Sequence, residues 1–352
     1  MRKLTFPMAV LAILAGCQGL LAPTPGVHTG TLGQSKYVIA VPKHWNGDLL
    51  MFAHGLMEEQ APLSANFDAE EPGNKALLNS GWMVAATSYR RNGVIVRDAV
   101  EDIDLLRKHI VSLYGRPKRT FVNGWSMGGA IGTMIAETHA GDYDGVLLVG
   151  AVLSLHDKDD PYRMTYRPAM PMLFLTNQSE LNSASVYVRH ASSGDKPVAL
   201  WTVKRDGHCN VNDPEVAAAI AALVKCSQTG QIDREKDGTV SMADRPSVAV
   251  LRDGHAYGRA GKTSEGYGNI YTSFVMADLA RLGVTPRSRF IVGKGDRSFV
   301  VMLATTYSDV PRGEWVAFIT ADGTLEVARN FENAAQTLGC SAGDEIFIAA
   351  GE

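Results

Sequence analysis

The sequence is poor in the residues that build metal sites and nucleic-acid interfaces. It has only four cysteines in 352 residues, with no C-x-x-C pair and no cluster of histidine and cysteine that has the spacing of a zinc site. Its 34 basic and 37 acidic residues give a formal net charge of −3, and no block of basic residues occurs. The composition therefore predicts no metal or other cofactor, no nucleic-acid partner and no polybasic contact with a membrane.

Long apolar runs are also scarce, and the one at the start is too short to span a membrane. Met1-Arg2-Lys3 precedes the mostly apolar residues 4–14, whereas a transmembrane helix needs about 20 such residues. The run ends in Leu14-Ala15-Gly16-Cys17, which resembles the lipobox of bacterial lipoproteins. This resemblance implies cleavage before Cys17, lipid on its sulfur and new amino group, and, with Gln18 following, sorting to the outer membrane. A plain secretory signal with an incidental cysteine is the alternative.

This leader predicts where the protein resides and how the mature chain begins. We expect residues 1–17 to be a lipoprotein signal peptide and residues 18–27, with Pro23, Pro25 and Gly26, to be a short tether. The mature protein would then be held in the bacterial cell envelope by a lipid anchor, facing the periplasm or the cell surface. The membrane is thus an expected partner, through the anchor alone.

The rest of the chain is long, and its cysteines are far apart. Cleavage before Cys17 would leave about 335 of the 352 residues, which exceeds one typical core and predicts two domains. An oxidising compartment permits a disulfide between Cys209 and Cys226 and leaves Cys340 unpaired.

The most informative motif is Gly124-x-Ser126-x-Gly128, within Thr120–Ala130. Phe121 and Val122 indicate the end of a buried strand, and the residues from Gly128 onward indicate a helix. A serine at such a sharp reversal has a strained backbone and an exposed side chain, next to the N–H groups that begin the helix. The motif therefore predicts that Ser126 is a nucleophile.

Apolar strands alternate with helices on both sides of this motif. The expected strands are Tyr37–Val41, Asp48–Ala53, Trp82–Ser88, Gly145–Val152, Met172–Leu175 and Val198–Val203, and the expected helices include Val100–Leu113, Gly128–His139 and Glu215–Val224. Most strands are apolar on both faces, which predicts an α/β fold with a mainly parallel sheet between two layers of helices. The dipeptide Asn46-Gly47 predicts a β-hairpin between the first two strands.

Residues 28–228 resemble the α/β-hydrolase superfamily, in which a serine, an acid and a histidine follow successive strands in that order. Ser126 matches the serine. Glu180 follows the strand that ends at Leu175 and takes the acid position, although the expected glycine before it is missing. His208 lies on a Gly-His loop after Val203 and matches the base. The resemblance implies that His208 takes the proton of Ser126 and that Glu180 orients the imidazole.

The same resemblance implies an oxyanion hole made of two backbone N–H groups. One belongs to the residue after the nucleophile, Met127, and the other to the loop His54-Gly55-Leu56, where we assign Leu56. Together these residues predict a serine hydrolase, most consistent with cleavage of a small-molecule carboxylic ester through an acyl-enzyme intermediate.

Other residues compete for the roles of acid and base. Asp195 and Asp206 are alternative acids, but neither directly follows the strand before the histidine strand. His255 is the sharper rival, because Arg-Asp-Gly-His occurs at residues 205–208 and again at residues 252–255. It lies beyond the expected end of the hydrolase domain, and we therefore prefer His208 as the base.

Residues 229–245 form a polar segment that we interpret as an acidic linker. Its acids at Asp233, Glu235, Asp237 and Asp244, with Gly238, have the spacing of an EF-hand calcium loop, which is the alternative interpretation. Pro246 prevents the helix that would follow such a loop, and this favours the linker.

Residues 246–352 are rich in strands and turns and contain an ordered series of motifs, including Gly266–Thr272 and Asp322–Asn330. They resemble the C-terminal β-domain of the S-adenosylmethionine hydroxide adenosyltransferases. The resemblance implies that Tyr267, Gly268 and Asn269 match residues that help to hold an adenosyl group, and Arg329 also matches a residue of the family. It further implies that the domain can assemble as a homo-oligomer. Ala321-Asp322 replaces the Ser-Arg pair that grips the amino-acid end, which removes a bidentate partner for a carboxylate.

Two other classes of function stay open beside the hydrolase. One is a lipoprotein whose C-terminal domain binds a nucleoside-like ligand through Tyr267, Asn269 and Arg329 while the hydrolase domain is inactive. The other is an assembly module that oligomerises through the C-terminal domain.

Overall fold

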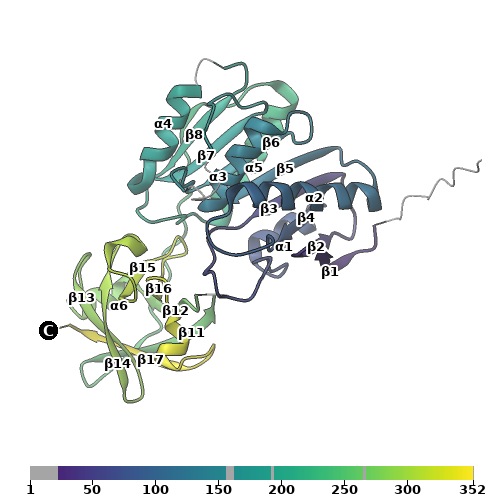
Figure 1. Ribbon diagram of the computed structural model, residues 1–352. Helices are drawn as coiled ribbons and strands as arrows, with labels where there is room; N and C mark the ends of the chain where they lie inside the picture. The colour runs from purple at the N-terminus through teal and green to yellow at the C-terminus, as the bar shows by residue number, and fades with distance from the viewer. Residues whose placement is uncertain (1–22, 156–161, 192–193, 265–266, 352) are drawn as a thin grey trace, which may run out of the picture.

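A computed structural model gives the structure of the protein and describes residues 23–155, 162–191, 194–264 and 267–351. The lipobox and Cys17 lie outside the described residues. The chain forms an α/β domain followed by a separate β-barrel, so that the predicted fold class is confirmed (Figure 1). In the described part of the chain, no helix is both long and apolar enough to cross a membrane.

The first domain is built on a nine-stranded sheet with the order β1-β2-β4-β3-β5-β6-β7-β8-β9. The strands are β1 (Gly26–Leu32), β2 (Ser35–Val41), β3 (Asp48–Ala53), β4 (Met83–Thr87), β5 (Arg119–Trp125), β6 (Gly145–Val149), β7 (Met172–Asn177), β8 (Val198–Val203) and β9 (Glu235–Asp237). From β4 to β9 all neighbours pair in parallel, and β1 and β2 form an antiparallel edge. All the parallel strands therefore end at the same edge of the sheet.

Helices cover both faces of this sheet because its central strands are apolar on both sides. Met172 and Phe174 of β7 face one buried cluster, and Leu173 and Leu175 face another, as the twofold repeat of a strand requires. Helices α2 (Val96–Tyr114), α3 (Met127–Thr138) and α4 (Leu181–Ala191) pack on the first face, and α1 (Pro72–Asn79) and α5 (Asp213–Thr229) pack on the second. A 3-10 turn, η1 (Gln178–Glu180), separates β7 from α4.

The hairpin predicted at Asn46-Gly47 is wrong. Strand β2 pairs with β4, and β4 separates it from β3. The polar groups of Asn46 are used elsewhere: its N–H donates to Gly81 O at 2.9 Å, and its side-chain amide donates to Ser80 O at 3.0 Å. The chain therefore passes from β2 to β3 without pairing these two strands. Strand β3 is buried between β4 and β5, and β4 lies between β2 and β3.

The segment expected to be an acidic linker contributes a strand to the sheet. Glu235–Asp237 forms β9 and pairs with β8, and Lys204 Nζ lies 2.7 Å from a carboxylate oxygen of Asp237. Within the described ranges, no group of three or more histidine, cysteine, aspartate or glutamate side chains is placed to hold a metal ion.

The C-terminal domain is a barrel of seven strands in the order β11-β12-β16-β15-β14-β13-β17, closed by pairing of β17 with β11, with β10 added beside β11. The strands are β10 (Val250–Arg252), β11 (His255–Thr263), β12 (Ile270–Val275), β13 (Arg289–Lys294), β14 (Arg297–Leu303), β15 (Trp315–Ile319), β16 (Thr324–Arg329) and β17 (Glu345–Ala350). Short helices α6 (Met276–Arg281) and α7 (Ala334–Leu338) and the turn η2 (Tyr307–Asp309) connect them. Closure leaves few free strand edges.

The permitted disulfide is not formed, since Cys209, Cys226 and Cys340 are all free thiols. Cys226 is a buried residue of helix α5. Cys209 instead lies at the carboxyl edge of the sheet, with its sulfur 3.4 Å from Val149 O. The two side chains therefore lie in different surroundings.

Candidate active site

Ser126 occupies a sharp turn between β5 and α3. Its φ of 56° and ψ of −114° lie outside the regions that a residue with a side chain ordinarily adopts. The turn is that tight because glycines flank it: a Cβ on Gly124 would lie 2.1 Å from Gly128 O, and a Cβ on Gly128 would lie 1.9 Å from Ala53 O. The sequence Gly-x-Ser-x-Gly thus makes this conformation sterically accessible and leaves Ser126 at the carboxyl edge of the sheet.

Ser126, His208 and Glu180 are joined by two hydrogen bonds. Nε2 of His208 lies 2.8 Å from Oγ of Ser126, and Nδ1 of His208 lies 2.6 Å from a carboxylate oxygen of Glu180. Glu180 ends the 3-10 turn after β7, and His208 follows β8, so the three side chains come from the carboxyl ends of β5, β7 and β8 at one edge of the sheet. The structure therefore brings the predicted serine, acid and histidine together.

The environment of His208 acts on its pKa in two directions. Burial of the ring lowers the pKa, while the neighbouring Cys209 sulfur and the Glu180 carboxylate raise it, and the net direction is upward. The other oxygen of Glu180 accepts a hydrogen bond from the Cys209 N–H at 3.1 Å. This carboxylate thus favours a protonated His208 and holds its ring in place.

The loop that carries His208, residues 204–212, is here called the base loop, and β7 fixes its shape. The side chain of Asn177 donates to Asn210 O at 2.8 Å and to Arg205 O at 3.1 Å, and accepts from the Asn210 N–H at 2.8 Å. Ser179 Oγ accepts from the Gly207 N–H at 2.9 Å. Because Asn177 is buried, these bonds replace those that water would make.

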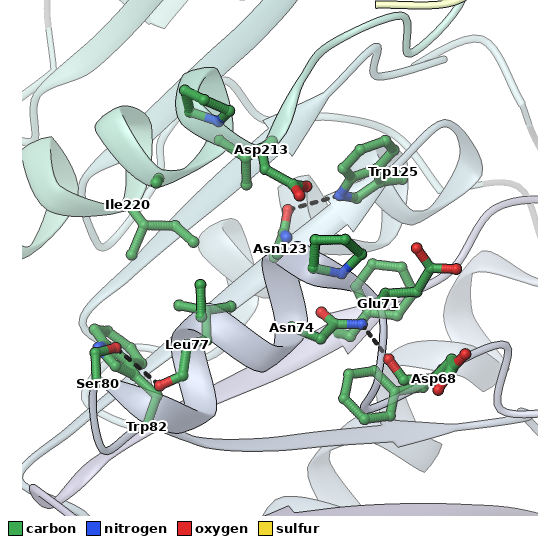
Figure 2. Close-up of a pocket in the computed structure, with 18 of the residues that line it drawn as sticks. Asp68, Glu71, Asn74, Leu77, Ser80, Trp82, Asn123, Trp125, Asp213 and Ile220 are labelled. Atoms are coloured by element: carbon green, nitrogen blue, oxygen red, sulfur yellow. Dashed lines mark hydrogen bonds between the residues drawn. The ribbon is translucent and has the colours of Figure 1, made fainter. Parts of the chain in front are cut away.

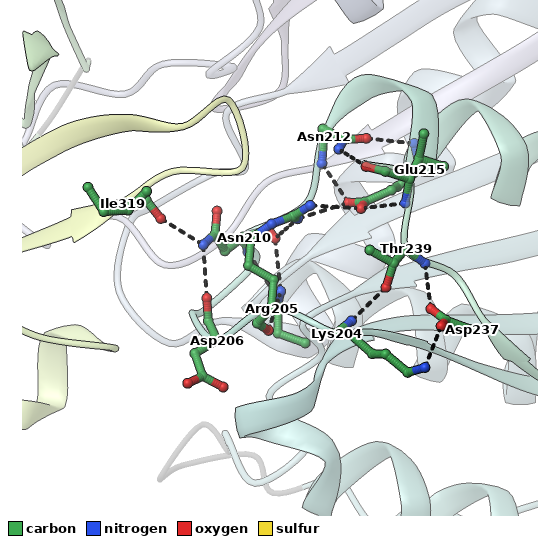
Figure 3. A network of polar contacts seen from close by, with 11 residues as sticks. Lys204, Arg205, Asp206, Asn210, Asn212, Glu215, Asp237, Thr239 and Ile319 are labelled. Carbon is green, nitrogen blue, oxygen red and sulfur yellow. Dashed lines mark hydrogen bonds and ion pairs between the residues drawn. The ribbon is translucent and has the colours of Figure 1, made fainter. Parts of the chain in front are cut away.

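A capping box at the start of α5 holds the other end of the base loop (Figure 3). The Asn212 side chain accepts from the Glu215 N–H at 3.0 Å, and the Glu215 carboxylate accepts from the Asn212 N–H at 2.8 Å. Arg205 donates to the same carboxylate, which is fully buried, and also to Asn210 O at 2.8 Å. The base loop is thereby joined to both a strand and a helix.

The two predicted oxyanion donors flank Ser126. Met127 is the first residue of α3, and the first N–H groups of a helix have no partner within it. Leu56 follows Gly55, whose Cβ, if present, would lie 3.2 Å from Ser126 Cβ. The loop after β3 therefore passes directly beside the serine.

The residue before this loop, His54, is a neutral structural histidine. It is 1% exposed, stacks on Tyr89 with ring centroids 4.1 Å apart, and its Nδ1 lies 2.8 Å from Gly55 O. Burial lowers the pKa of His54 to about 4, so the ring carries no charge at neutral pH. The Tyr89 hydroxyl donates to His54 O at 3.0 Å and fixes the loop further.

The rival residues lie elsewhere or have other partners. Nδ1 of His255, at the start of β11 in the barrel, lies 2.8 Å from Asp253 O, and its ring packs edge-on against Phe347. Asp206 belongs to the base loop, but its carboxylate accepts from Gln178 at 2.9 Å and not from His208.

Two cavities lie between the domains. The larger, of about 1170 Å³, lies between α1, α5 and the barrel, and Figure 2 shows Trp82, Asn123, Trp125 and Ile220 around it. The smaller, of about 290 Å³, lies between the base loop, including His208, and barrel residues 305–307 and 318–322. Ser126 lines neither cavity, but His208 lines the smaller one, which therefore lies beside the serine–histidine pair and not over the serine itself.

The smaller cavity is acidic. Glu71, Asp213, Asp322 and Glu326 line it. Burial raises the pKa of Asp213, and the negative charges of Asp322 and Glu71 raise it further. Burial also raises the pKa of Glu326, whose carboxylate accepts from the Tyr307 hydroxyl at 3.1 Å. This lining disfavours an anion in the cavity.

The residues predicted to bind a nucleoside-like ligand have different surroundings. Asn269 is 7% exposed and donates to Tyr307 and Glu326, both at 2.8 Å, which places it behind the smaller cavity. Arg329 donates to Gly313 O at 2.7 Å and to Thr337 Oγ1 at 2.9 Å, and so joins the loop before β15 to helix α7. Tyr267 packs edge-on against Phe331. None of the three lines either cavity.

Sequence reasoning missed several residues that shape the site. Cys209 has its sulfur 3.8 Å from His208 Nε2 and a φ of 53°, and Asn177 and Asn210 hold the base loop. The signal for Cys209 and Asn210 was their place directly after His208. Asn177 could be found only by noting a buried polar residue at the end of an apolar strand.

Two family models match parts of the chain. Residues 90–231 match the serine aminopeptidase S33 model, and residues 266–347 match the SAM hydroxide adenosyltransferase C-terminal domain. The chain thus combines an α/β-hydrolase domain with a C-terminal domain of the adenosyltransferase type. No curated protein matches it by sequence.

Solved structures show distant similarity to esterases and peptidases of the α/β-hydrolase fold. Est1E from Butyrivibrio proteoclasticus is 11% identical over 58% of this chain and 100% of its own, with a TM-score of 0.43. An esterase from Pyrococcus furiosus is 12% identical over 58% and 90%, with a TM-score of 0.47. An acylaminoacyl peptidase from Pyrococcus horikoshii is 14% identical over 54% and 38%, with a TM-score of 0.42.

Proposed function

We propose that the protein is a serine hydrolase that cleaves carboxylic esters through an acyl-enzyme intermediate. The observation that carries this proposal is the 2.8 Å contact between Ser126 Oγ and His208 Nε2, with Glu180 2.6 Å from the other ring nitrogen. These distances are those that proton transfer from a serine to an imidazole requires.

In the acylation step, Ser126 Oγ bonds to the ester carbonyl carbon while its proton passes to His208 Nε2. The carbonyl oxygen becomes an oxyanion, and the N–H groups of Met127 and Leu56 are the donors that would bind it. The carbon–oxygen bond to the alcohol then breaks, and the leaving oxygen takes the proton from His208. Glu180 stabilises the imidazolium that exists between these two transfers.

In the deacylation step, water replaces the alcohol. His208 takes a proton from the water as its oxygen bonds to the acyl carbon, and returns that proton to Ser126 Oγ as the acyl bond breaks. The products are a carboxylic acid and the free enzyme, so the reaction needs no cofactor and no redox partner.

A fluorophosphonate probe on the purified protein tests the proposal most directly. We expect covalent labelling at Ser126, and hydrolysis of p-nitrophenyl esters with a preference for one acyl chain length. The matching p-nitroanilides, which differ only in the leaving group, test whether an amide is also cleaved. An unlabelled, folded protein would remove the proposal and favour a binding lipoprotein with an inactive hydrolase domain.

A further inference from the structure

The base loop faces the end of one barrel strand. Strand β15 ends at Ile319, and residues 318–322 form one wall of the smaller cavity, with base-loop residues on the opposite wall. A space of about 290 Å³ thus lies between the base loop and this part of the barrel. A direct contact across this space connects the barrel to the segment that carries His208.

Asn210 makes that contact with its side-chain amide (Figure 3). Nδ2 of Asn210 donates to Ile319 O at 3.0 Å and to Asp206 O at 2.9 Å. The same side chain covers Gly207, where an added Cβ would lie 2.4 Å from Asn210 Cβ. One amide therefore closes the turn from Asp206 to Asn210, which contains His208, and ties it to β15.

This contact differs from the ion pair that the described residues also form between the domains. Lys262 of β11 forms an ion pair with Glu71 at the start of α1, and neither residue belongs to the base loop. Across the described parts of both domains, the Asn210–Ile319 bond is the hydrogen bond that joins the base loop to the barrel. A substitution at Asn210 therefore removes the contact that involves the base loop, and a substitution at Lys262 removes the contact that does not.

We propose that Asn210 is a positioning residue through which the barrel holds His208 at the correct distance from Ser126. The proposal rests on the hydrolase function proposed above and gives the barrel a part in it. Asn210 touches no reacting atom; it fixes the turn that carries the imidazole. Its loss should let the base loop move away from the 2.8 Å contact, and a displacement of about 1 Å can cost on the order of 10²-fold in rate.

The test compares Asn210→Leu with Lys262→Met in the full-length protein. Leucine has nearly the shape of asparagine but cannot donate, and methionine keeps the alkyl chain of lysine without its charge. For p-nitrophenyl butyrate we expect Asn210→Leu to lower kcat at least about tenfold and to change KM less than about twofold, because acylation and not binding needs the base. Lys262→Met should leave both constants near those of the unmodified protein.

Hydrogen exchange of residues 204–212 provides a readout that does not depend on activity. We expect faster exchange in this segment for Asn210→Leu alone, with a thermal midpoint close to that of the unmodified protein. A kcat unchanged by Asn210→Leu, equal losses in both variants, or unchanged exchange would each overturn the inference. If the unmodified protein neither labels nor hydrolyses esters, the hydrolase proposal fails, and the exchange experiment still decides whether Asn210 holds the base loop.

Discussion

Ser126 and His208 are 82 positions apart in the chain, yet Oγ of the serine lies 2.8 Å from Nε2 of the histidine. The contact exists because β5 and β8 run parallel in one sheet and end at the same edge. Ser126 follows β5 directly, and His208 follows β8 after a short loop. The spacing of these two strands in the sheet therefore sets the distance between the two side chains.

Ser126→Ala should abolish both labelling by a fluorophosphonate probe and ester hydrolysis, because the nucleophilic oxygen is removed. Without the nucleophile, the protein could accelerate hydrolysis only by binding the substrate. We therefore expect kcat to fall by on the order of 10⁴-fold or more. Circular dichroism should be unchanged. Labelling that persists at a different serine would contradict the assignment of this turn.

His208→Ala should reduce kcat nearly as much as Ser126→Ala, since the residues of such a site act as a unit. His255 provides a matched control, because it follows the same three residues, Arg-Asp-Gly, but lies in the barrel against Phe347. His255→Ala should retain most of the activity. A loss of activity in His255→Ala with an active His208→Ala would falsify the choice of base.

The pH dependence of kcat/KM should show the raised pKa of His208. Only the neutral imidazole can accept the proton of Ser126, so activity is lost as the pH falls through this pKa. Although burial lowers the pKa, Cys209 and Glu180 raise it more, so the acidic limb should lie above the ordinary value of 6.5. Glu180→Gln removes one of the raising causes and should move the limb to lower pH with a lower maximum rate. Asp206→Asn, in the same loop, is the control, and a limb that Glu180→Gln does not move would contradict the prediction.

Gly128→Ala should destabilise the protein strongly, since the new Cβ would lie 1.9 Å from the Ala53 carbonyl oxygen and one backbone would have to move. We expect a loss of at least about 3 kcal/mol in the free energy of unfolding. A Cβ on Gly132, in the same helix, would lie 2.7 Å from the flexible end of Leu148 and at an ordinary 3.8 Å from Val122, so a change below about 1 kcal/mol is expected for Gly132→Ala. Urea denaturation of both variants measures the difference, and equal stabilities would refute the steric argument.

Cys17→Ser tests the lipid anchor that the sequence predicts. The substitution removes the sulfur that would carry the lipid, so the protein should be released from membranes or should remain unprocessed. Fractionation of cells and mass spectrometry of the mature N-terminus measure this outcome. A mature chain that begins elsewhere without lipid would instead indicate a plain secretory signal.

Local sterics and periodicity made much of this protein predictable from its sequence. Two glycines around Ser126 encode a turn that few other residues could form, and apolar runs such as 172–175 encode buried strands. The order of serine, acid and histidine along the chain named residues that the structure places within hydrogen-bond distance. Such signals depend on neighbours in the chain, so a sequence carries them directly.

Only the tertiary structure decided which distant segments meet. Asn46-Gly47 has the local preference of a hairpin turn, but burial of β3 between β4 and β5 outweighs that preference and separates β2 from β3. Cys209 and Cys226 look like a pair in sequence and lie in different surroundings. The bond from Asn210 to Ile319 joins residues 109 positions apart in two domains. No local pattern encodes such contacts, because they arise from how whole sheets and domains pack.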